Sequence, residues 1–470
     1  MTPTKSFVLF AMAGAIAAPA LSAPKDPPFA TVERSVHQRT GLAVRWQQDA
    51  EAREESMRAV HALLKKPLTV RSAVQIAVLN NRDLLATFED VGVSAADLRE
   101  AGMLKNPGID VSVRFPDRSP RGPDWEESVV FDVLDLLMLP LRKHVAADQL
   151  ASAQLRVADA VLKLVAETKS AIYSVQADED VISRLKVVVD SEAAAIDLAQ
   201  RQHEAGNITD LDLLRQQAAY NEARLELANA EAERREHREK VNRLLGLWGA
   251  DTDWKISGSL PSLPEGDVPL PGLESLAIEQ RLDLAAAHAE LASVVRALGL
   301  TKSYRYVGAL QFGGDTERER EGDHLTGPKL ALELPIFNQG QARIAKGEAE
   351  LRRAERRFEG LAIDIRADVR ELYGRLSAKR EAARFYRDEI LPDRAAMVQQ
   401  SLLRYNGMLL GNYELFAVKK EEAEAGRKSV EALRDYWITR TELERAVGGN
   451  LSASRPTPVT SKKLRSKKSL

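Results

Sequence analysis

The hydrophobic and polar positions of the chain first follow the period of a helix and then that of a strand. After Thr69, a plausible N-cap, apolar residues recur at three- and four-residue spacing. Between Ile109 and Phe115 they alternate with polar residues, which predicts a strand with one apolar face. Glu126–Leu139 predicts a second strand, ended by Pro140. A helical start is therefore followed by a strand pair at 109–139.

The next stretch predicts a helical hairpin of unusual length. Leu141–Gln202 contains neither proline nor glycine and would form a helix of about 60 residues, roughly 90 Å long. Ordinary globular helices are far shorter. Gly206 then permits a reversal, because glycine adopts positive φ at little cost. Thr209 or Asp210 can cap a return helix that ends near Leu245. We therefore expect a coiled-coil hairpin at 141–245.

The same order of elements returns about 200 residues later, which indicates an internal duplication. Alternation predicts a strand pair at 304–336, made of Tyr304–Gly313 and Lys329–Ile336. A second helical hairpin is predicted at 342–447, with a kink at Pro392 and its turn at Gly407, the counterpart of Gly206.

The remaining segments frame these two repeats. Residues 1–23 predict a signal peptide, because Lys5 precedes an apolar run that is too short to span a bilayer. The expected organisation is then an N-terminal arm at 24–66 with one packed helix, repeat 1 at 67–248, a proline-rich linker at 249–271, repeat 2 at 272–447, and a basic disordered tail at 448–470.

Composition narrows the classes of function. The net charge of −2 gives no reason to expect nucleic acid as a partner. The chain has no cysteine, which excludes disulfides, zinc–thiolate sites and a lipid attached to cysteine. No nucleophile elbow, phosphate loop or HExxH motif occurs, and the histidines lack metal-ligand spacing. We therefore predict no catalytic residue, no metal site and no cofactor.

The strand pairs impose a condition on assembly. Four strands per chain cannot close a barrel, and an open sheet edge cannot lie in lipid. Closure at eight or more strands requires several copies of the chain, and three copies would supply twelve strands. The helical hairpins of such an assembly would surround the same axis and form a tube.

Four segments in this order resemble the TolC family of outer-membrane efflux proteins: LTVRSAVQIAVLNNRDL, RQHEAGNITDLDLL, LPIFNQGQ and RYNGMLLGNYELF. The resemblance covers roughly residues 67 to 450. It implies a mixed α/β membrane protein, a trimer whose 12-stranded β-barrel is joined to a long α-helical coiled-coil barrel. It also implies a location in the outer membrane, with the helices extending into the periplasm.

The resemblance also assigns roles to the two turns. It places Arg201, Gly206, Arg404 and Gly407 at periplasmic tips that dock an adaptor and close the tunnel. Many relatives carry aspartates at the sixth and ninth residues after the second-turn glycine, where this chain has Tyr413 and Phe416. The candidate aperture residues are Asp210, Asp212, Tyr413, Glu414 and Phe416. For the three acids, helix capping is an equally good interpretation.

The partners implied are two further copies of the chain, outer-membrane lipid, a periplasmic adaptor (membrane fusion) protein and an inner-membrane pump of the RND type. The function implied is passive conduction of substrates such as heavy-metal ions or drugs to the exterior. Two alternatives remain open: a duct for type I protein secretion, and a coiled-coil envelope protein without a channel.

Overall fold

The structure is a computed structural model that describes residues 27–115, 117, 123–266, 271–318 and 323–449. The predicted signal peptide and the tail beyond Gly449 lie outside the described residues. The chain divides into two compact units. Of the described residues, the strand unit holds those up to Thr31 together with those in Asp90–Gln154 and Ala286–Arg357, and the hairpin unit holds the others.

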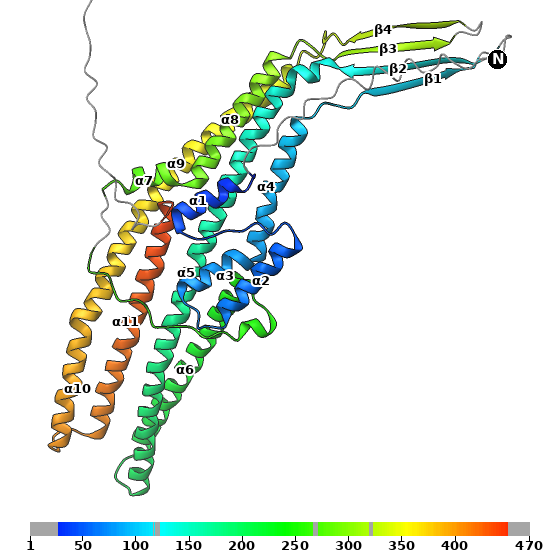
Figure 1. The fold of residues 1–470 in the computed structure, drawn as a ribbon. Helices are drawn as coiled ribbons and strands as arrows, with labels where there is room; N and C mark the ends of the chain where they lie inside the picture. Colours follow the sequence, from blue (N-terminus) through cyan, green and yellow to red (C-terminus); the bar gives the residue numbers. More distant parts are fainter. Residues whose placement is uncertain (1–26, 116, 118–122, 267–270, 319–322, 450–470) are drawn as a thin grey trace, which may run out of the picture. The chain divides into compact units, whose positions relative to one another are not determined.

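The elements follow one another as the duplication predicts, with strands and then long helices in each half (Figure 1). Their bounds are α1 Ala30–Thr40, α2 Ala50–Leu64, α3 Val70–Asn80, α4 Arg82–Ala101, β1 Gly108–Arg114, β2 Asp124–Asp132, α5 Val133–Glu204, α6 Asp210–Leu245, α7 Leu273–Gln280, α8 Leu282–Ser303, β3 Leu310–Arg318, β4 His324–Leu332, α9 Gln341–Phe385, α10 Leu391–Asn406 and α11 Asn412–Ala446.

The strand unit contains one antiparallel sheet in the order β1-β2-β3-β4 (Figure 1). The two strand pairs of the sequence therefore join through β2 and β3, with Phe131 opposite Phe312. Phe312 in turn lies opposite Leu330 of β4. Among the described residues, β1 and β4 each pair on one side only, so both edges of this sheet are open there.

Most large apolar residues of the sheet lie on one face, as the alternation predicts, although Glu127 lies opposite Val111 on that same face. In β1, Ile109 and Val111 are 73% and 55% exposed, although both are large apolar residues. On the other face Ser112 lies opposite Glu126, and Glu126 lies opposite Glu317. Exposed apolar residues on one face suit a sheet that contacts lipid there, and the polar face then suits water.

The second strand is shorter than the sequence pattern suggested. It was expected to continue to Leu139, but β2 ends at Asp132 and α5 begins at Val133. The Asp132 carboxylate accepts the N–H of Asp135, and Asp135 pairs with both terminal nitrogens of Arg142 at 2.7 and 3.0 Å. These contacts stabilise a helix start. Pro140 therefore lies inside α5 rather than at the end of a strand.

The strands of the second repeat are displaced from their expected limits. Tyr304–Gly313 was expected for the first, but α8 continues to Ser303 and β3 is Leu310–Arg318. Lys329–Ile336 was expected for the second, and β4 is His324–Leu332. The bounds of β3 and β4 depend on pairing between neighbouring strands. Polar residues whose sequence predicts a loop are part of these strands because they have cross-strand partners. Thr316 and Thr326, for example, have their hydroxyl oxygens 3.2 Å apart.

The hairpin unit is held together by apolar clusters and ion pairs between its long helices. One buried cluster joins α7, α9 and α11 and includes Ile365, Leu376 and Tyr436. Its flanking ion pairs include Lys379–Asp435, with Nζ and the carboxylate oxygen 2.9 Å apart. These contacts fix each returning helix against its partner, as in a coiled-coil hairpin.

Three further predictions concern the kink at Pro392, the N-terminal arm and the proline-rich linker. Near Pro392, where a kink was predicted, a π-helical turn, Tyr386–Ile390, separates α9 from α10. The N-terminal arm was expected to contain one helix, but α1 is also helical and buries Val32 and Val36. The proline-rich linker packs against the unit and is not a free connection, because Leu263 belongs to the buried cluster of α7, α9 and α11.

The pairing of His237 with Asp178 predicts a pH dependence of stability. Nδ1 of His237 lies 2.7 Å from the Asp178 carboxylate, between α6 and α5. The hydrogen bond with Asp178 raises the pKa of His237, and burial only partly opposes this. Because the pKa is raised on folding, the stabilisation is complete below the unfolded pKa of about 6.5 and is lost as the pH rises through the folded pKa.

His237→Gln should therefore lower the thermal unfolding temperature more at pH 6 than at pH 8.5. The matched control is His144→Gln, which replaces an exposed histidine. An equal loss for His237→Gln at both pH values would show that the ion pair with Asp178 does not stabilise the hairpin.

Candidate functional site

The tips of the two helical hairpins lie at the same end of the hairpin unit (Figure 1). At the first tip α5 ends at Glu204 and Gly206 has φ +72°. The N–H groups of Gly206 and Asn207 donate to the carbonyls of His203 and Gln202, both at 2.8 Å. Thr209 caps α6 by accepting the N–H of Asp212. This closes the turn that the sequence predicted.

The second tip repeats the geometry with one change. Gly407 has φ −82°, whereas Met408 has φ +58°. The N–H groups of Met408 and Leu409 donate to the carbonyls of Tyr405 and Arg404 at 2.9 and 2.8 Å. The structural counterpart of Gly206 is therefore Met408, and the expected match with Gly407 is wrong. The hydrogen bonds that end a helix, and not the position of glycine, decide which residue is left-handed.

Substitutions at the two tips should distinguish the residues with positive φ, Gly206 and Met408, from Gly407. Gly206→Ala should destabilise its turn by about 1 kcal/mol, since a side chain is strained at positive φ. Amide exchange at Asn207 would then accelerate roughly fivefold. Gly407→Ala should not accelerate exchange at Leu409, and Met408→Gly should slow it. Faster exchange at Leu409 in Gly407→Ala would contradict the assignment.

The three acids predicted at the aperture each hold the start of a return helix. Asp210 lies 2.6 Å from Nε2 of His203. Asp212 accepts the Thr209 hydroxyl at 2.7 Å, and this hydrogen bond lowers the pKa of its carboxyl. Glu414 accepts the N–H of Gly411 at 3.2 Å. The contacts of Asp212 and Glu414 belong to helix caps, whereas Asp210 pairs with His203 across the turn, and a position of the three acids in the pore stays a prediction.

Tyr413 connects the two hairpins. Its hydroxyl donates to Oε1 of Gln202 at 2.7 Å, which joins the start of α11 to the end of α5. Burial and the nearby Asp212 charge raise the pKa of Tyr413, so the hydroxyl stays neutral and can donate. Sequence reasoning had selected Tyr413 only because relatives have an aspartate there. It missed Gln202, since no local pattern marks a partner so distant in the chain.

The two arginines are not brought together. Arg201 pairs with Asp197 on its own helix at 2.8 Å, and both side chains are exposed. Arg404 is exposed, and its carbonyl accepts the N–H of Leu409. Phe416 is half-buried on α11. Their predicted roles in docking and closure remain predictions.

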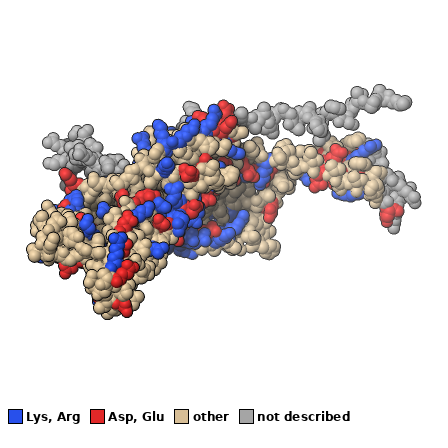
Figure 2. Space-filling model, turned by 90° about the horizontal axis from the view of Figure 1, so that it is seen from below, with Lys and Arg blue, Asp and Glu red and all other residues tan. Residues whose placement is uncertain are grey.

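The second tip also exposes large apolar side chains. Met408 and Leu409 are 95% and 80% exposed, and Leu403 of α10 is exposed beside them. At the first tip Leu211 and Leu214 are exposed as well. Exposed apolar groups gathered at one end are typical of surfaces that meet another protein. Figure 2 looks from below, the end at which both tips lie in Figure 1, and acidic and basic side chains lie interspersed on the face that it shows.

Within the described residues, no helix combines the length and apolarity needed to cross a bilayer. The same residues contain no group of three or more His, Asp or Glu side chains that could hold a metal ion.

Comparisons with known proteins agree with this architecture. The model of the outer membrane efflux protein family matches residues 141–247. The cobalt-zinc-cadmium resistance protein CzcC of Cupriavidus metallidurans is 21% identical over 387 residues, which cover 81% of this chain and 90% of that protein.

Solved structures share the fold at low identity. The CmeC outer membrane channel of Campylobacter jejuni has a TM-score of 0.70 at 14% identity, covering 82% of this chain and 88% of that one. A membrane protein from Pseudomonas aeruginosa has a TM-score of 0.68 at 19% identity, covering 81% and 92%. Taken together, the family match, the relative in sequence and the shared fold show that the chain resembles outer membrane efflux proteins, and they support a location in the outer membrane.

Proposed function

We propose that three copies of the chain form the exit duct of a tripartite efflux system. Their strands close one 12-stranded barrel in the outer membrane, and their helical hairpins form a tunnel that extends into the periplasm. Conduction through this duct is passive. An inner-membrane pump of the RND type supplies the energy, and a periplasmic adaptor connects the pump to the hairpin tips.

One observation carries this proposal, namely the four-stranded sheet with two open edges and an exposed apolar face. An open edge in lipid leaves backbone N–H and C=O groups without partners, each at a cost of several kcal/mol. If β4 of one copy pairs with β1 of the next, both edges are satisfied at once. The number three comes from the resemblance to the TolC family.

The hairpin tips support the proposed docking. Exposed apolar residues at both tips offer a surface that an adaptor can cover, and Met408 and Leu409 protrude furthest. The Tyr413–Gln202 hydrogen bond supports a resting closed state, because it holds the second hairpin against the first. Engagement of the adaptor would break this bond and let the hairpins separate.

For the substrate we favour heavy-metal ions over drugs, on the observation that CzcC, a cobalt-zinc-cadmium resistance protein, matches most of the chain. Cells that lack the protein should accumulate cobalt, zinc or cadmium at least several-fold when challenged, and the wild-type chain should restore export. Unchanged metal content in these cells would contradict the proposal that heavy-metal ions are the substrate. Retention of an exported polypeptide inside them would instead favour a secretion duct.

A further inference from the structure

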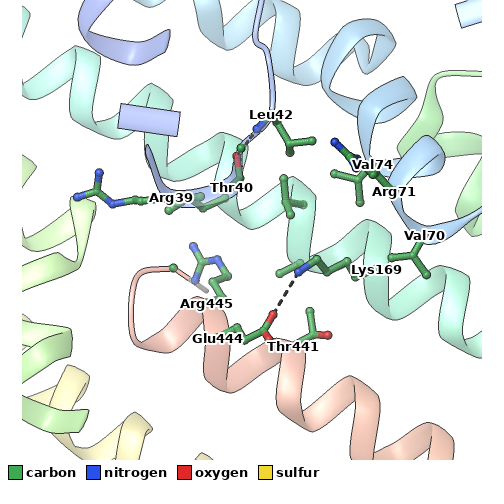
Figure 3. A pocket seen from close by; sticks show the side chains of 15 residues that line it. Arg39, Thr40, Leu42, Val70, Arg71, Val74, Lys169, Thr441, Glu444 and Arg445 are labelled. Carbon is green, nitrogen blue, oxygen red and sulfur yellow. Dashed lines mark hydrogen bonds and ion pairs between the residues drawn. The ribbon is translucent and has the colours of Figure 1, made fainter. Parts of the chain in front are cut away.

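A cavity lies within the hairpin unit, far along the chain from either tip residue. Its volume is about 350 Å³, in the range of small-molecule sites. Four segments line it: the end of α1 with the loop that follows, the start of α3, the middle of α5 and the end of α11 (Figure 3). No residue of the candidate site at the tips takes part.

Much of the wall is apolar. Every lining segment except α11 contributes apolar residues. These are Leu42, Val70, Val74, Leu162, Val165 and Ala166. Leu42 and Val74 are themselves buried in the fold. A ligand that fits here must therefore present an apolar body.

The charged residues of the wall are mostly basic. Lys169 is paired with Glu444, with Nζ and the carboxylate oxygen 3.1 Å apart. Arg445 is paired with Asp159 at 3.2 Å. Each of these pairs is neutral by itself, so the positive charges of the other two arginines of the wall are in excess.

Two arginines account for this excess. Arg39 donates only to the carbonyls of Ser35 and Gln280 in the part of the chain that the structure describes. Burial lowers the pKa of its guanidinium, and no carboxylate opposes that effect. Arg71 is exposed at the start of α3 and forms no ion pair with any described residue. The cavity therefore has two cations that lack a carboxylate partner.

The cations do not all lie on the same side of the cavity. In Figure 3 Arg71 and Arg445 lie on different sides of the cavity, with Lys169 between them, while Arg39 extends away. Val70 and Arg71 also begin α3, so their N–H groups have no acceptor inside the helix. A negative charge placed near Arg71 would meet both the side chain and these donors.

We infer that this cavity binds a small organic anion, a carboxylate carried on an apolar body. The apolar body lies against Leu42, Val74 and Leu162, and the carboxylate lies at Arg71. Such a ligand would tie the N-terminal segment to α3, α5 and α11 of the same chain. The inference does not depend on what the duct conducts.

The test uses the purified full-length protein in detergent and 1-naphthoate as probe, with binding followed by calorimetry. We expect saturable binding at one site per chain that weakens as salt is added. Arg71→Gln should weaken it at least about tenfold, the effect of losing one charge-assisted hydrogen bond. Arg53→Gln, which removes an exposed arginine from α2, should leave the affinity unchanged.

Two further probes and one further variant make the outcome decisive. 1-Naphthylmethylammonium, with a similar body and the opposite charge, should not bind, and acetate should compete only weakly. Ala166→Leu, which narrows the cavity, should weaken 1-naphthoate without altering the thermal unfolding temperature of the unliganded protein. Absence of saturable binding, equal binding of the cation, or an unchanged affinity in both Arg71→Gln and Ala166→Leu would overturn the inference.

Discussion

Replacing Tyr413 by phenylalanine should open the reconstituted channel. The substitution removes the hydroxyl that donates to Gln202 and leaves the ring in place. Such a bond contributes about 0.5–1.5 kcal/mol, so three chains that open together should raise the ratio of open to closed channels at least about tenfold. Single-channel recording in planar bilayers measures this as a larger fraction of time in the open state.

The matched control is Tyr405→Phe, because Tyr405 lies on α10 near the same tip and its hydroxyl has no hydrogen-bond partner among the described residues. Gln202→Leu should reproduce the effect of Tyr413→Phe, and the double variant should add little, since both remove the same bond. Additive effects, or equal opening by Tyr405→Phe, would contradict a role for this bond in closure.

A charge on the apolar face of the sheet should prevent assembly. Val111→Arg places a guanidinium where the account puts lipid, at a cost of about 2–4 kcal/mol per chain near the middle of the bilayer. We expect loss of the heat-sensitive, SDS-resistant oligomer from outer-membrane fractions. The cost recurs in every copy, which makes this the largest effect on stability that we predict.

The matched control for Val111→Arg is the same substitution at the next residue, Ser112. Ser112 lies on the polar face opposite Glu126, so Ser112→Arg should leave the oligomer intact. The two variants add the same side chain one residue apart on one strand. Similar losses for both, or none for either, would contradict the assignment of the apolar face to lipid.

The sequence allowed the order of elements and the faces of the strands to be predicted, because both follow from local periods. Alternation in β1 identified Ile109 and Val111 as one face, and the long run without proline or glycine identified α5. Thr69 as a cap is confirmed for the same reason, since its partner Ser72 lies three residues away.

The boundaries of helices and strands could not be predicted from local periods where they depend on residues far away in the sequence. The strand β3 continues through charged residues to Arg318 because β2 and β4 lie on both sides of it. The start of α5 depends on Asp132 as a cap, although alternation continues past it. At the tips, the left-handed residue is Met408 beside a glycine, and the partner of Tyr413 is 211 residues away.

The central claim, that copies of this chain close into a conducting duct, is tested most directly by planar bilayer recording of the purified oligomer. We expect discrete conductance steps of one size for the wild type and none for a preparation of Val111→Arg. If neither the wild type nor Tyr413→Phe conducts after incorporation into the bilayer, the claim that copies of this chain close into a conducting duct is contradicted.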